Sequence, residues 1–200
     1  MECSRCCRNN GPMNIPNALT LFRMALIPVM VLVFLLPFSS SAVVSSGIFV
    51  LAAVTDWLDG YLARKLNQST SFGAFLDPVA DKLMVAIALV LMVGQQDSVW
   101  FTLPALVVVA REILVSALRE WMADIGKRGS VKVSFVGKVK TTVQMIAITV
   151  LLAVEPEPGP LFYLGYLLLY VAVLLTIWSA GLYIRAAWQD LTEAASQPGA

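Results

Sequence analysis

The sequence predicts an all-α, polytopic membrane protein with six transmembrane helices. Hydrophobic residues make up 58% of the chain and charged residues 14%, which is not the balance of a soluble globular domain. Several apolar runs approach the roughly twenty residues that a spanning helix needs, and the others reach that length when polar inner ends are included. The six runs are 18–38, 42–63, 76–95, 99–118, 139–154 and 161–184.

One membrane domain is expected over residues 14–188, between a short cytoplasmic extension (1–13) and a carboxy-terminal tail (189–200). Met13 is an alternative start, and no cleavable signal peptide is expected, because the first run continues into the membrane domain without a cleavage-like site. A cysteine cluster in the extension could bind metal or accept palmitate. The chain has no second ligand pair and no histidine, which disfavours metal binding there. The cluster is Cys3, Cys6 and Cys7.

The basic residues predict the orientation of the chain in the membrane. Three connections, 37–41, 94–98 and 155–160, contain no lysine or arginine. The basic residues fall instead near the termini, in the connections around 64–82 and 119–140, or in the helix portions that lead to them. Because cytoplasmic loops are enriched in lysine and arginine, both termini and these two connections are expected in the cytoplasm.

Four aspartates stand in a fixed frame within this apolar sequence, namely Asp56-x2-Asp59-Gly60-x2-Ala63-Arg64-x8-Gly73-x3-Asp77-x3-Asp81. A carboxylate at the centre of a membrane helix costs roughly 2.5–3.5 kcal/mol, so four together need a compensating partner such as divalent cations. The spacing puts each pair of aspartates on one face of its helix. Two neighbouring antiparallel helices would then hold a two-metal site of oxygen ligands, for which Mg²⁺ is expected and Mn²⁺ is a substitute.

The depth of these aspartates indicates an active site at the cytoplasmic side. Asp56 follows Ala42 by about 21 Å along a helix that enters from outside. It therefore lies in the inner third of a hydrocarbon core about 30 Å thick.

The aspartate frame resembles the signature of the CDP-alcohol phosphatidyltransferase family, and the likeness extends over nearly the whole chain. The resemblance implies a homodimeric enzyme of the bacterial inner membrane that moves a phosphatidyl group from a CDP-linked lipid to an alcohol. It also implies that the four aspartates hold two metal ions and that Asp81 is the catalytic base. The positions expected to bind the CDP-lipid are Asn17, Thr20, Asp59, Gly60, Ala63, Arg64, Thr70 and Gly73. For Asn17 and Thr20, helix capping is an equally good alternative.

Basic residues on the fourth and fifth predicted helices are candidates for acceptor binding. Arg111 and Arg119 belong to the fourth helix, and Lys138 and Lys140 begin the fifth. An arginine inside a span is a functional hypothesis by default, although the positive-inside rule and anionic lipid headgroups offer an alternative reason for such charges. The segments that hold these residues also resemble the family branch that uses glycerol 3-phosphate.

The predicted reaction is transfer from CDP-diacylglycerol to sn-glycerol 3-phosphate, which gives phosphatidylglycerophosphate and CMP. Two other acceptors fit the same chemistry: phosphatidylglycerol, in a cardiolipin-type reaction, and inositol phosphate. A membrane transporter or scaffold is the alternative from a different class, because such proteins also carry intramembrane charges. The expected partners are the two substrates and membrane lipids, with no nucleic acid.

Overall fold

The computed structural model describes residues 15–66, 71–124 and 135–195, and within these residues the regular structure is entirely helical. The prediction of an all-α protein is therefore confirmed. Each apolar run of the sequence coincides with one helix. The helices are α1 (Ile15–Leu35), α2 (Ser41–Leu66), α3 (Ser71–Gln96), α4 (Val99–Asp124), α5 (Phe135–Ala153) and α6 (Pro160–Ala195). The last helix continues beyond residue 188, so that predicted boundary falls within α6.

Several helices are long and apolar enough to cross a membrane, which makes this a multi-pass membrane protein. Four candidate spans lie in the described residues, at Ala18–Leu35, Ser41–Leu58, Val99–Met122 and Pro160–Gly181. Helix α5 contains a shorter apolar stretch, Val139–Ala153. Helix α3 is apolar in its second half and carries Asp77, Asp81 and Lys82 in its first half.

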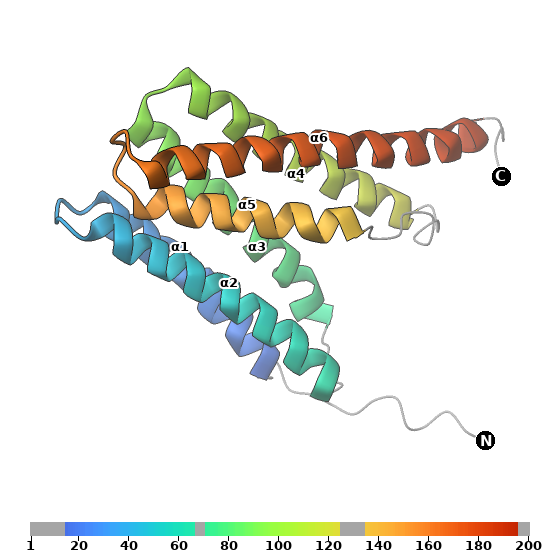
Figure 1. Ribbon diagram of the computed structural model, residues 1–200. Coiled ribbons are helices and arrows are strands. Elements are labelled where there is room, and N and C mark those ends of the chain that lie inside the picture. Colours follow the sequence, from blue (N-terminus) through green and yellow to red (C-terminus); the bar gives the residue numbers. More distant parts are fainter. Residues whose placement is uncertain (1–14, 67–70, 125–134, 196–200) are drawn as a thin grey trace. The chain divides into compact units, whose positions relative to one another are not determined.

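The chain divides into two compact units, residues 1–88 and 89–200. In the first unit α1 packs along α2, and Met30 on α1 and Phe49 on α2 are fully buried (Figure 1). In the second unit α6 packs against both α5 and α4. Gly165 permits close packing of α5 and α6, because a Cβ atom at that position would lie 2.6 Å from Leu151.

The connections that lack basic residues are short turns between consecutive helices. Between α3 and α4, Asp97 adopts a φ of 39°, in the left-handed region that reverses the chain. Ser98 stands directly before α4, and its carbonyl accepts a hydrogen bond of 2.9 Å from the backbone N–H of Thr102. The Tyr166 hydroxyl on α6 also donates to Oε1 of Gln96 at 2.6 Å, which fixes this end of the second unit.

Candidate active site

One face of α1 contacts a carboxylate from each of the two helices that carry the aspartate frame. Nη1 of Arg23 lies 2.6 Å from Oδ1 of Asp56 on α2. The Thr20 hydroxyl donates a hydrogen bond of 2.5 Å to Oδ1 of Asp77 on α3. Thr20 and Arg23 are three residues apart on α1, and both are buried. Because positions three apart are neighbours on a helix, one face of α1 contacts both Asp56 and Asp77.

The burial of these side chains explains the ion pair. The side chain of Arg23 is 2% exposed, whereas that of Asp56 is 44% exposed. A buried guanidinium is costly unless a carboxylate or other polar groups compensate its charge. Asp56 supplies that negative charge while much of its carboxylate remains open to a further ligand.

The other frame residues lie on the expected helices, although many of their side chains fall outside the description. Asp81 is partly buried and follows Asp77 by one turn of α3, and Gly73 is buried in the first turn of the same helix. Pro78, directly after Asp77, removes a backbone donor and so frees a carbonyl one turn earlier. The predicted metal-binding and CDP-lipid-binding residues whose side chains are not described are Asn17 on α1, Asp59, Ala63 and Arg64 on α2, and Thr70. Gly60 also belongs to α2.

The described carboxylates have the donor chemistry of a Mg²⁺ site, because Asp56, Asp77 and Asp81 offer only oxygen ligands. Within the described side chains, no three acidic or cysteine groups are placed to hold a metal ion together. Asp59, the fourth predicted ligand, is not among those side chains. The metal-binding role of the four aspartates therefore stays a prediction, and what the structure adds is the contact of two of them with α1.

Arg23 is a site residue that the sequence reasoning missed. It stands within the first apolar run, three residues after Thr20. An arginine inside a membrane span is a functional signal, and the same criterion that selected Arg111 would have selected Arg23. Thr20 lies in the second turn of α1, well past the helix start at Ile15, so it does not cap that helix.

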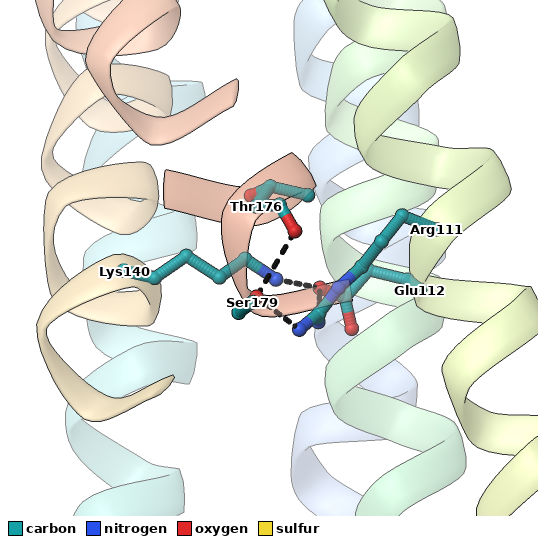
Figure 2. A network of polar contacts seen from close by, with 5 residues as sticks. All are labelled: Arg111, Glu112, Lys140, Thr176 and Ser179. Atoms are coloured by element: carbon teal, nitrogen blue, oxygen red, sulfur yellow. Dashed lines mark hydrogen bonds and ion pairs between the residues drawn. The ribbon is translucent and has the colours of Figure 1, made fainter. Parts of the chain in front are cut away.

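A second polar cluster, here called the α4–α6 network, lies where three helices of the second unit meet (Figure 2). Lys140 Nζ on α5 is 2.5 Å from Oε1 of Glu112 on α4, and Arg111 Nη1 is 3.1 Å from the same oxygen. Arg111 Nη2 donates to the Ser179 hydroxyl on α6 at 2.8 Å. Ser179 in turn donates to the Thr176 carbonyl at 3.0 Å. These five residues make up the network.

The network brings together two of the four residues predicted to bind the acceptor, Arg111 and Lys140, on one carboxylate. Arg119 belongs to α4 and Lys138 to α5, but their side chains are not described. Glu112 and Ser179 were not predicted as site residues. Glu112 could have been found as the acid beside an intramembrane arginine, whereas a serine in an apolar helix gives no comparable signal.

Comparison with known proteins assigns the chain to a family. Residues 13–178 match the family model for CDP-alcohol phosphatidyltransferase. Curated relatives named CDP-diacylglycerol–glycerol-3-phosphate 3-phosphatidyltransferase include those of Pectobacterium atrosepticum (58% identical over 180 residues), Salmonella choleraesuis (57% over 180) and Yersinia enterocolitica (56% over 181). Each comparison covers 90% of this chain and 98% of the relative. Since the model and these relatives both span most of the sequence, the chain belongs to the CDP-alcohol phosphatidyltransferase family.

Proposed function

We propose that this enzyme transfers a phosphatidyl group from CDP-diacylglycerol to sn-glycerol 3-phosphate, giving phosphatidylglycerophosphate and CMP. One observation carries the proposal: the complete aspartate frame stands in a chain 56–58% identical to enzymes named for this reaction. The α4–α6 network is in keeping with an anionic acceptor, because it places two cations beside one carboxylate within apolar helices.

The chemistry is displacement at phosphorus. A hydroxyl oxygen of glycerol 3-phosphate forms a bond to the phosphorus that carries the diacylglycerol group, and the bond from that phosphorus to the CMP oxygen breaks. Asp81 accepts the proton of the attacking hydroxyl. Two Mg²⁺ ions, or Mn²⁺ as a substitute, would neutralise the charge of the diphosphate and of the leaving group when bound.

Each part of the first unit has a role in this proposal. Asp56, Asp59 and Asp77 would hold the metal ions, and Asp81 would be a further ligand in addition to its role as base. Arg23 and Thr20 hold two of these carboxylates in place, because each contacts one of them from the same face of α1. The CDP moiety binds along α1, α2 and the start of α3, at Asn17, Thr20, Asp59, Gly60, Ala63, Arg64, Thr70 and Gly73.

In the membrane, all six helices would cross the bilayer and place the aspartates near the cytoplasmic surface. The charge pattern supports this topology, since the turns that join α1 to α2, α3 to α4 and α5 to α6 contain no lysine or arginine. Both termini would then be cytoplasmic. We place the enzyme in the bacterial inner membrane, as a homodimer, in line with the family resemblance.

The test is acceptor competition with the purified enzyme in mixed micelles that contain labelled CDP-diacylglycerol. We expect CMP release with glycerol 3-phosphate, with little release when phosphatidylglycerol or inositol phosphate replaces it. Chelation with EDTA should stop the release, and added Mg²⁺ should restore it. If glycerol 3-phosphate supports no CMP release while another acceptor does, the proposed acceptor is wrong. Transport into proteoliposomes without any turnover would instead favour a transporter.

A further inference from the structure

Glu112 is the one acid in the α4–α6 network, and it is shared by two cations. Both Lys140 Nζ and Arg111 Nη1 contact the same oxygen, Oε1. Lys140 is 2% exposed and lies within apolar helices, where an uncompensated ammonium group is costly. Glu112 therefore lowers the formal charge of the network from +2 to +1 and holds both cations on one oxygen acceptor (Figure 2).

Buried polar atoms in and beside the α4–α6 network have no hydrogen-bond partner among the described residues. Nε of Arg111 and Oγ1 of Thr176 are buried with no hydrogen-bond partner among the described residues. The same is true of Oε1 of Gln144, which lies one turn after Lys140 on the same face of α5. Native proteins satisfy nearly all buried polar groups, so unused atoms of this kind indicate that a polar ligand or water completes the site.

An anionic ligand would need the cations that Glu112 already holds. A phosphate monoester carries a charge of about −1.5 to −2 near neutral pH, more than a single carboxylate, and offers three acceptor oxygens. A phosphodiester carries one negative charge, and a neutral alcohol carries none. The attraction between the cations and a ligand grows with the ligand charge, whereas Glu112 repels every anion that approaches.

We infer that Glu112 is a specificity-determining residue. It keeps Arg111 and Lys140 in place when no acceptor is bound, and it sets how much negative charge an acceptor needs in order to bind them. The inference rests on the proposed function, because it takes the α4–α6 network as the acceptor site. A phosphomonoester displaces the carboxylate from the two cations. A monoanionic or neutral acceptor leaves the ion pairs intact.

The test is a charge series in the purified full-length enzyme, with inorganic phosphate and dimethyl phosphate as probes and calorimetric titration as the readout. Glu112→Gln keeps an acceptor oxygen but raises the network charge to +2, and Lys140→Met lowers it to zero. The double variant restores +1. Ser179→Ala is the matched control, because it removes a neutral partner of Arg111 and leaves the charge unchanged.

Phosphate affinity should follow the charge. We expect Glu112→Gln to bind phosphate on the order of tenfold more tightly than the wild type, and Lys140→Met on the order of tenfold more weakly. The double variant should recover most of the loss caused by Lys140→Met, and Ser179→Ala should not bind more tightly than the wild type. Dimethyl phosphate should also gain affinity in Glu112→Gln, because no carboxylate then competes with it for the two cations.

The opposite order of phosphate affinities would show that Glu112 only stabilises the packing of the helices. In that case Glu112→Gln binds phosphate no better than the wild type, or the double variant binds it no better than Lys140→Met. If Glu112→Gln does not fold, the comparison of phosphate affinity between Lys140→Met and the double variant still tests whether Glu112 opposes phosphate binding. Normal CMP release with glycerol 3-phosphate, but no phosphate binding by the wild type, would overturn the inference and leave the proposed function intact. Absence of that CMP release would refute the proposed function, whatever the titrations show.

Discussion

Replacement of Asp56 by asparagine should destabilise the protein even when no metal ion is present. Nη1 of Arg23 is 2.6 Å from the Asp56 carboxylate, and the arginine side chain is 2% exposed. With an effective dielectric constant of about 20, two unit charges at that distance attract by about 6 kcal/mol at most. Asparagine keeps an oxygen to accept a hydrogen bond, and the Asp56 side is half open to solvent. We therefore expect Asp56→Asn to lower the free energy of unfolding by about 3 kcal/mol, which is at the low end for a broken buried ion pair.

The order of stability among matched variants tests the reasoning better than a single value does. Arg23→Met removes the buried charge itself, and the exposed Asp56 carboxylate can be solvated, so the loss should be about 1 kcal/mol. The double variant Arg23→Met/Asp56→Asn should be more stable than Asp56→Asn alone. Asp77→Asn is the control, because the Thr20 hydroxyl can donate equally well to an amide oxygen. Its loss should stay below about 1 kcal/mol.

The assay is thermal unfolding of each variant in detergent with excess EDTA, so that metal binding does not contribute to stability. Equal midpoints for Asp56→Asn and Asp77→Asn would refute the reasoning. So would a double variant less stable than Asp56→Asn. In either case the ion pair between α1 and α2 would not be what supports the buried arginine.

Three further predictions concern single substitutions. Arg111→Lys should raise the KM for glycerol 3-phosphate by about tenfold and the KM for CDP-diacylglycerol by less, because one ammonium group cannot reach both partners of the guanidinium. Steady-state kinetics with each substrate varied would measure this difference. Equal effects on both KM values would indicate a structural role for Arg111. Gly165→Ala should lower the free energy of unfolding by about 1–3 kcal/mol, because its Cβ would meet the buried Leu151. Gly181→Ala, on the same helix, places its Cβ in open space and should leave the stability unchanged in the same unfolding assay. Asp97→Gly should be tolerated at its φ of 39°, while Asp97→Val should lose about 1 kcal/mol or more of stability; equal midpoints for these two variants would contradict a left-handed turn there.

The sequence by itself determined the class of fold and the helices. The apolar runs predicted each of the six helices in the described residues, because a bilayer demands long uninterrupted apolar segments. The ends of the helices were predicted less accurately, because α3 begins at Ser71 and α6 continues to Ala195, both beyond the apolar runs. Polar terminal turns carry no hydrophobic signal, so a criterion based on apolar runs ends too early.

The family assignment also came from the sequence, because the aspartate frame is a local pattern of residue types and spacings that can be read without any contact between helices. The partners of those residues could not be read in the same way. The contact of Arg23 with Asp56, and that of Lys140 with Glu112, each join residues that lie on different helices and far apart in the sequence. Such contacts depend on which face each helix turns toward its neighbour.

In a membrane protein that rotation is poorly marked in the sequence, because lipid-facing residues are as apolar as those of the core. On α2, for example, Phe49 is fully buried while Trp57 is 68% exposed, and both are large and aromatic. On a soluble helix the exposed face would be polar and would reveal the orientation. Only the tertiary packing decided that Thr20 and Arg23 face two aspartates and that Arg111 and Lys140 share one carboxylate.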